Sequence, residues 1–339
     1  MSASRCGAAC LLLGLVAGCA GPTRPALHGV THGSYAMGTL LELTLYGPDA
    51  AALHETLQDV TQLVERLEAG MSRHDAASDV SRLNRAAGGA PLPVDPAVAD
   101  ILRQALHYAQ LTRGAFDVTV GPLVALWTRA AERDALPEPE ALERARARVA
   151  ADGIELHADG RVALRSGTSL DLGGLAKGYA LDRALSLLEA PRVASALLNF
   201  GQSSSWAVGA PPGAAGWRLL VRAPGGGFAG VITLRDQALS VSGSLGQWSE
   251  IGGRRFGHVL DPRSGWPLTR RRQALVVAPS ASLAEALSTA LLVLGEQEGI
   301  ALVAAQPGCA GLLLDADGQR WATPSWVRAT RYAPLDEGA

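Results

Sequence analysis

The segment from Asp171 to Tyr179 carries the strongest chemical signal in the sequence. It reads DLGGLAKGY, and its paired glycines let backbone amides and carbonyls approach a ligand closely. Lys177, the only lysine of the chain, lies where a helix is expected to begin. A helix N-terminus favours anions, and a lysine there adds a point charge that suits phosphate. The spacing matches neither a Walker loop nor a dinucleotide fingerprint, and a tight strand-to-helix turn with a surface lysine remains the alternative.

A pair of oxygen-bearing residues lies on a helix predicted over residues 281–295. Glu285 and Thr289 are four residues apart, so their side chains share one helix face. A carboxylate and a hydroxyl so placed offer two hard oxygens to Mg²⁺, which keeps waters and phosphate oxygens as further ligands. Taken alone, such a pair is more typical of an ordinary helix surface.

A histidine follows an expected strand in the segment GHVLDPRSG, residues 257–265. The strand would deliver His258 to the edge of an Asp-Pro turn, where an imidazole can act as a general base near neutral pH. A purely structural histidine is the alternative at this position.

Two common chemistries are disfavoured. No Gly-x-Ser-x-Gly segment occurs, so serine hydrolase chemistry is not indicated, and the serines of 203–205 and 242–244 are expected in turns. Zinc is not indicated either, because cysteine is nearly absent.

The elements that must position these residues follow from apolar periodicity. Alternation predicts a half-buried strand over 40–46, and apolar residues at three- and four-residue spacing predict helices over 49–69 and 95–112. Beyond them we expect a hairpin at 154–165, short strands within 193–260, strands at 274–278 and 311–315, and helices at 137–150, 175–189 and 281–295. Strands and helices mix without a regular βαβ repeat, which predicts an α+β fold.

The first residues read as an export signal. Residues 1–18 hold one arginine and a short apolar run, and Val16–Cys19 resembles a bacterial lipobox in which Cys19 accepts the lipid. An ordinary secretory signal is the alternative. We therefore expect a lipoprotein anchored at Cys19 on the periplasmic side of a bacterial membrane, with a tether over 19–34, a domain over 35–330 and a tail over 331–339.

Composition bounds the remaining possibilities. The chain has 339 residues, 48% of them hydrophobic, which suffices for a substantial core. Its formal net charge is −2 and it has no long basic run, so binding to nucleic acid is not favoured. Removal of the signal and acylation of Cys19 would leave Cys309 as the one free thiol, so no intrachain disulfide is expected.

Several segments, in their order along the chain, together resemble the ApbE family, the FAD:protein FMN transferases. The resemblance runs from about Tyr35 to Gly295. It is carried by Tyr35–Thr39, Ser81–Asn84, Ala115–Thr119, Asp171–Asp182, Asn199–Gly201, Ser242-Gly243, His258–Gly265 and Ala284–Thr289. It implies an ApbE or T-fold-like architecture, with mixed sheets, packed helices and a flavin cleft between two subdomains.

The resemblance also implies an activity. FMN would pass from FAD to a threonine or serine hydroxyl of an exported acceptor flavoprotein, such as an Rnf- or Nqr-type subunit, with Mg²⁺ bound and AMP released. Gly174 would give Mg²⁺ a main-chain carbonyl beside the side chains of Glu285 and Thr289. His258 would deprotonate or orient the acceptor hydroxyl. The flavin site would be lined by Met37, His74, Ala115, Phe116, Asp117, Asp171, Lys177 and Val259.

The chain departs from the family pattern at four places. Glu285 stands where the family usually has an aspartate, Gln202-Ser203 where Gly-Asp is usual, Val241 where a threonine precedes Ser-Gly, and His74 where an aromatic is usual. Two further functions therefore stay open. One is a lipoprotein that binds FAD without turnover, and the other is a pyrophosphatase that hydrolyses FAD to FMN and AMP.

Overall fold

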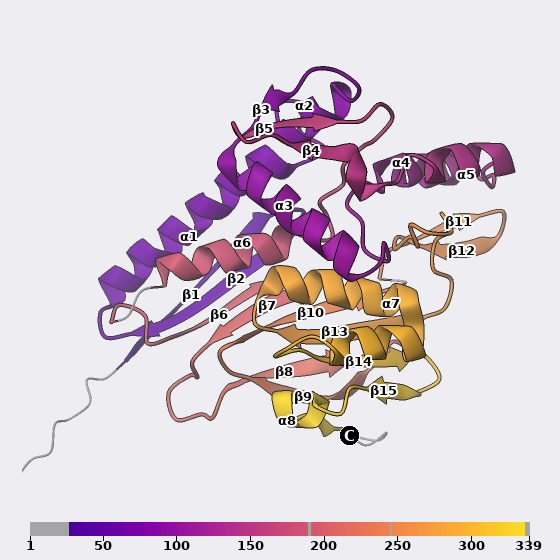
Figure 1. Cartoon of the computed structure of the whole chain (residues 1–339). Helices are drawn as coiled ribbons and strands as arrows, with labels where there is room; N and C mark the ends of the chain where they lie inside the picture. The colour runs from indigo at the N-terminus through magenta and orange to yellow at the C-terminus, as the bar shows by residue number, and fades with distance from the viewer. Residues whose placement is uncertain (1–26, 189–190, 245, 336–339) are drawn as a thin grey trace, which may run out of the picture.

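An eight-stranded antiparallel sheet forms the framework of the computed structural model, which describes residues 27–188, 191–244 and 246–335 (Figure 1). Every neighbouring pair of strands is antiparallel. In spatial order the strands are β1 (His28–Ala36), β2 (Thr39–Gly47), β6 (Ser195–Phe200), β7 (Ser204–Val208), β10 (Gln237–Gly243), β13 (Arg272–Ala278), β14 (Ala310–Asp315) and β15 (Arg320–Ala322).

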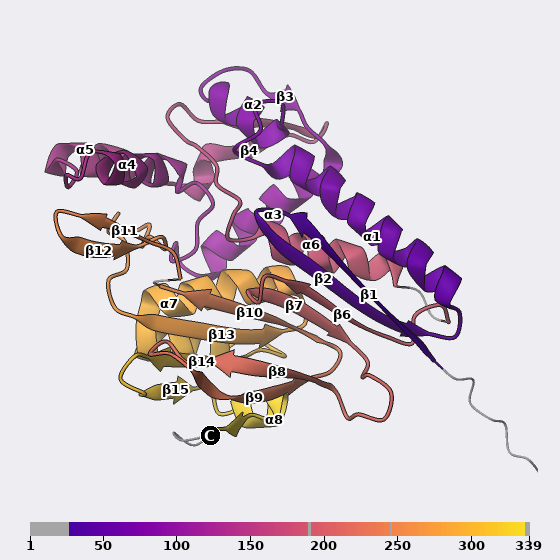
Figure 2. The same ribbon diagram turned by 180° about the vertical axis from the view of Figure 1, so that it is seen from behind.

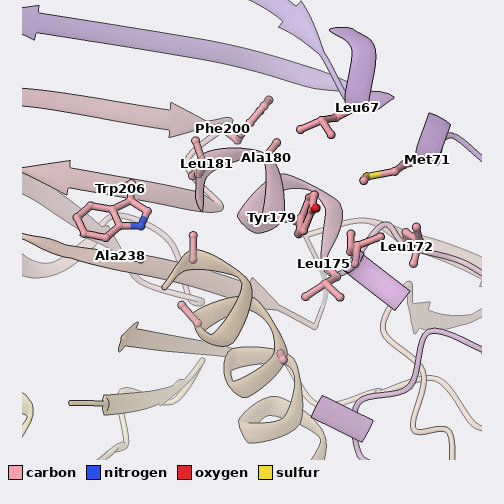
Figure 3. Packing of buried hydrophobic residues seen from close by; sticks show 14 of the residues in the cluster. Leu67, Met71, Leu172, Leu175, Tyr179, Ala180, Leu181, Phe200, Trp206 and Ala238 are labelled. Atoms are coloured by element: carbon pink, nitrogen blue, oxygen red, sulfur yellow. The ribbon is translucent and has the colours of Figure 1, made fainter. Parts of the chain in front are cut away.

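Helices cover one face of this sheet. They are α1 (Ala50–Met71), α6 (Ala176–Ala184) and α7 (Ala281–Ala304), and α3 (Pro96–Leu111) packs against α1. The alternate residues Leu41, Leu43 and Leu45 of β2 are all buried in the main core beneath the helices, as a half-buried strand requires. Figure 3 shows Tyr179 and Leu181 of α6 packed among side chains from α1 and from the sheet.

A second, three-stranded sheet covers part of the opposite face (Figure 2). It consists of β8 (Trp217–Arg222), β9 (Phe228–Leu234) and β16 (Ala333–Pro334), with α8 (Trp326–Thr330) packed nearby. In β13, Val276 faces the main core, whereas Leu275 and Val277 face this second core. Because both faces are covered, this strand is apolar without alternation.

The rest of the described chain forms smaller elements beside the main sheet (Figure 1). Helix α2 (Asp79–Arg85) lies near a small sheet of β3 (Leu92–Pro93), β4 (Ile154–Leu156) and β5 (Arg161–Leu164). Helices α4 (Gly121–Glu132) and α5 (Pro139–Arg146) pack against a hairpin of β11 (Trp248–Ile251) and β12 (Arg254–Gly257) around Leu123, Trp127 and Phe256. Short 3₁₀ turns span Ala151–Gly153 and Leu185–Leu187.

The α+β fold is confirmed, and two predicted boundaries are wrong. Residues 28–34, expected in a tether, form most of β1, which pairs with β2 along its whole length. Residues 333–334, expected in a tail, pair with β9. The signal peptide and Cys19 lie outside the described residues, as do 336–339.

Helix α7 is longer than the predicted helix 281–295 and has a break inside it. Gly295 has φ 78° and ψ −160°, after which the helix resumes to Ala304. Within the described part of the chain, α7 alone is long and apolar enough to cross a bilayer. It packs against α6, β10, β13 and β14, so its apolar residues form core in this protein.

Candidate functional site

Lys177 and Glu285 meet where the N-terminal parts of α6 and α7 lie side by side. Lys177 Nζ is 3.8 Å from Glu285 Oε1 and donates a hydrogen bond to Gly173 O at 3.2 Å. The two side chains are 20% and 5% exposed, so the pair is largely shielded from water. The structure thus brings together the glycine loop, the amine and the carboxylate that the sequence marks as chemical features.

A backbone contact between α6 and α7 fixes this arrangement. A Cβ atom on Gly178 would lie 2.6 Å from the carbonyl carbon and oxygen of Ala281, so only glycine allows the two helices to approach so closely. Asp182 then joins them, because its carboxylate accepts hydrogen bonds from Ala281 N at 2.7 Å, Ser282 N at 2.9 Å and Ser282 Oγ at 2.6 Å. A carboxylate at the N-terminus of α7 also complements the helix dipole.

The Glu285 carboxylate is satisfied at one oxygen only. Oε1 accepts a short hydrogen bond from Ser204 Oγ, whereas Oε2 is buried and has no hydrogen-bond partner in the described chain. Leaving a buried carboxylate oxygen without a donor is costly, so Oε2 is suited to a cation or to a ligand's donor group.

Thr289 lies one turn further along α7, with its Oγ1 3.4 Å from Ser242 Oγ. A carboxylate oxygen and a hydroxyl on one helix face are hard ligands of the kind that Mg²⁺ prefers. The described residues contain no cluster of three histidine, cysteine or acidic side chains, so Mg²⁺ here would need backbone and ligand oxygens as well.

The glycine loop before α6 is held by Asp171. Its Oδ1 accepts a hydrogen bond from Gly173 N at 2.9 Å, and its Oδ2 lies 3.2 Å from Arg73 Nε. Gly174 is exposed, and a Cβ atom there would lie 3.4 Å from the ring of Phe116. Asp171 and Gly174 therefore belong to the loop whose Gly173 carbonyl accepts the Lys177 hydrogen bond, and Phe116 lies against this loop.

The other residues of the Ala115–Asp117 segment are engaged with the protein itself. Ala115 and Phe116 are buried in the main core. Asp117 Oδ1 accepts hydrogen bonds from the backbone and hydroxyl of Thr119, at 2.8 and 2.7 Å. Burial raises the pKa of Asp117, and these two bonds oppose the rise.

Three further predicted residues have no side-chain hydrogen bond or ion pair to the Lys177–Glu285 pair in the described chain. Met37 lies in the turn between β1 and β2 with φ 48°, half-buried against the main core. His74 is exposed, although its neighbour Arg73 contacts Asp171. Val259 also packs against the core, and its carbonyl accepts a hydrogen bond from Leu268 N.

His258 is exposed at the end of β12 and is held through one carbonyl. Its backbone N and its Nδ1 lie 3.1 and 3.0 Å from Gln247 O. Nδ1 must carry the proton to donate to a carbonyl, which leaves Nε2 as a free acceptor. The preceding Gly257 lies tightly between two backbone segments, since a Cβ atom there would lie 1.9 Å from Ser244 O and 2.9 Å from Leu268 O. No hydrogen bond or ion pair between described residues joins His258 to Lys177 or Glu285.

The prediction of turns at the two serine segments is wrong at the residues that matter most. Ser204 begins β7 and bonds Glu285, and Ser242 lies in β10 beside Thr289. Asp182 and Arg73 were not predicted as functional. Ser204 and Trp206 are two residues apart, and in a strand such residues face the same side of the sheet. This spacing is the sequence signal that indicates a strand at Ser204.

Two surface hollows, of about 290 and 420 Å³, lie elsewhere. Both are bordered by Arg270, Arg272 and Glu296, and neither is lined by a predicted site residue.

Comparison with known proteins connects this geometry to a family. The family model described as "ApbE family" matches residues 37–313. A protein of Treponema pallidum named FAD:protein FMN transferase is 32% identical over 91% of this chain and 90% of its own length. A protein of Salmonella typhimurium with the same name is 29% identical over 96% and 97%. The solved structure of the flavin transferase ApbE from Vibrio cholerae superposes with a TM-score of 0.79 at 26% identity, covering 89% of this chain and 99% of that one. This chain is a member of the ApbE family.

Proposed function

We propose that this protein is an FAD:protein FMN transferase, which moves FMN from FAD to a threonine or serine hydroxyl of an acceptor protein and releases AMP. The observation that carries the proposal is the buried Oε2 of Glu285, which has no hydrogen-bond partner among the described residues and lies next to the solitary lysine and the paired-glycine loop. This is a site for a diphosphate with a cation. The names of the relatives at 29–32% identity support the same reaction.

The chain's own residues have distinct roles in binding. Lys177 and the amide of Gly174 bind the diphosphate, while Asp171 holds the loop in place through Gly173 N. The donor set fits Mg²⁺, with Glu285 Oε2, Thr289 Oγ1 and the Gly174 carbonyl as the ligands that would hold it. A Mg²⁺ ion held by these residues would supply positive charge to the diphosphate and to the departing AMP.

His258 accepts the proton of the acceptor hydroxyl. The hydroxyl oxygen forms a bond to the phosphorus of the FMN half, the bond from that phosphorus to the bridging oxygen breaks, and AMP leaves with this oxygen. The proton goes to Nε2, the ring nitrogen that the bond between Nδ1 and Gln247 O leaves free.

Export and anchoring belong to the same proposal. The lipobox-like segment ending at Cys19 supports a lipid anchor on the periplasmic side of a bacterial membrane. The acceptor would then be an exported flavoprotein, of which Rnf- and Nqr-type subunits are the candidates by family resemblance.

The test incubates purified protein with FAD, Mg²⁺ and an acceptor domain that carries a Ser/Thr-Gly-Ala-Ser/Thr segment. Fluorescence that stays on the denatured acceptor supports the proposal. Free FMN would instead indicate a pyrophosphatase, and intact bound FAD a binding protein without turnover.

Replacing His258 tests its assigned role within that assay. His258→Gly is expected to reduce transfer by at least about 100-fold, a typical loss for a general base, while FAD binding is retained. Transfer at the wild-type rate would refute the role.

A further inference from the structure

The two oxygens of the Glu285 carboxylate have different surroundings. Oε1 accepts the hydrogen bond from Ser204 Oγ and lies 3.8 Å from Lys177 Nζ. Oε2 is buried and has no hydrogen-bond partner in the part of the chain that the structure describes. The last torsion of a glutamate is broad, so without a donor on one oxygen the plane of the carboxylate could rotate and neither oxygen would keep a fixed direction.

Ser204 is built into the sheet. It pairs with Phe200 of β6 and Ser240 of β10, and only 1% of its surface is exposed. Successive residues of a strand face opposite sides, so Ser204 and Trp206 share the face that is covered by helices. Trp206 accordingly donates its ring N–H to Asp182 of α6 at 3.1 Å.

From this arrangement we infer that Ser204 is a positioning residue of the cation site. Its hydroxyl holds one oxygen of the Glu285 carboxylate and so fixes the plane of the group, which gives the other oxygen a fixed direction for binding Mg²⁺. The inference rests on the proposed function and concerns how Glu285 is held for ligation. A glutamate side chain has one more torsion to restrain than an aspartate, and the hydrogen bond restrains it before the ligand arrives.

The matched control lies next to Ser204 in the same strand. Ser205 is also buried and also donates one side-chain hydrogen bond, to Asn199 Oδ1 at 2.9 Å. It faces the opposite side of the sheet from Glu285. Ser204→Ala and Ser205→Ala therefore each remove one buried hydroxyl, and only the first removes a donor to Glu285.

The experiment titrates MgCl₂ into the full-length protein by calorimetry, with and without FAD. Ser204→Ala is expected to raise the Kd for Mg²⁺ by about 10- to 100-fold, as loss of a group that orients a metal ligand does. Ser205→Ala should leave this Kd unchanged. In transfer assays, Ser204→Ala should raise the KM for Mg²⁺ while kcat at saturating Mg²⁺ changes by less than about threefold. Thermal unfolding without Mg²⁺ confirms that both variants are folded.

The possible failures can be told apart. A wild-type protein that binds Mg²⁺ and a Ser204→Ala variant with the same Kd would overturn this inference alone. An equal loss of affinity in both variants would also overturn it, because the effect would then not depend on contact with Glu285. A wild-type protein that does not bind Mg²⁺ at all would overturn the metal assignment of the proposed function, and this inference with it.

Discussion

Asp182 is expected to contribute more to stability than an ordinary helix cap, and Asp182→Ala tests this. Its carboxylate accepts four hydrogen bonds, from Ala281 N, Ser282 N, Ser282 Oγ and Trp206 Nε1. Hydrogen bonds to a charged group each contribute about 1.5–3 kcal/mol to the free energy of unfolding. The total loss is smaller than the sum of four such bonds, because losses at one carboxylate are not additive and water can reach this half-buried side chain. We therefore expect the free energy of unfolding to fall by about 3–5 kcal/mol.

The comparison variant is Asp49→Ala. Asp49 is the N-cap of α1 and accepts two hydrogen bonds, both from backbone N–H groups of its own helix. Its loss should cost about 1 kcal/mol, as is usual for a cap. A third variant, Asp182→Asn, keeps the shape of the side chain but turns an amide donor toward other donors, so an intermediate loss of about 2 kcal/mol is expected.

Urea unfolding followed by far-UV circular dichroism measures all three variants. Because Asp182 holds the N-terminus of α7 against α6, Asp182→Ala should also weaken FAD binding, whereas Asp49→Ala should not. If Asp182→Ala costs no more than Asp49→Ala, Asp182 does not join the two helices in the way the distances indicate, and the reasoning is refuted.

Three further outcomes are expected. Lys177→Met should raise the Kd for FAD about tenfold, as the loss of a charged hydrogen bond does. Arg183→Met, on the same helix, should leave this Kd unchanged. Fluorescence titration with FAD measures both variants, and an equal rise in Kd for the two would contradict the role of Lys177. Gly178→Val should lower the free energy of unfolding by about 1–3 kcal/mol, because its side chain would collide with the Ala281 carbonyl; urea unfolding of wild-type stability would contradict the close packing. Burial raises the pKa of Cys309 from 9.0 to about 11, and only the thiolate is alkylated. Near pH 8 the alkylation of Cys309 should therefore be about 100-fold slower than that of an exposed cysteine. Its rate should increase as the pH rises toward 11. Peptide mapping after iodoacetamide treatment measures this, and rapid alkylation at pH 8 would contradict it.

Elements with strong periodicity were predictable from the sequence to within a few residues. The helix expected over 49–69 is α1, Ala50–Met71, and the strand expected over 40–46 is β2, Thr39–Gly47. In both, the apolar spacing reports directly which face is buried. The loop from Asp171 and the Glu285–Thr289 pair were also predicted as chemical features.

What could not be predicted depends on contacts between distant segments. Strand β1 was missed because its residues are mostly exposed and its order comes from pairing with β2. The second half of α7 was missed because Gly295 resembles a helix end. Asp182 and Ser204 act across 99 and 81 residues of chain, and no local pattern in a sequence reports such a contact.

The wedging of Gly257 between two carbonyls has a consequence for substrate choice. With Gly257 against Ser244 O and His258 tied to Gln247 O, the imidazole has little freedom to search for its partner. In the proposed transfer, the conformational adjustment then falls to the incoming polypeptide. We therefore expect a target hydroxyl on a flexible loop to reach the imidazole more readily than the same residue inside a rigid helix. Selectivity among client proteins would accordingly depend on their local mobility as much as on their side chains.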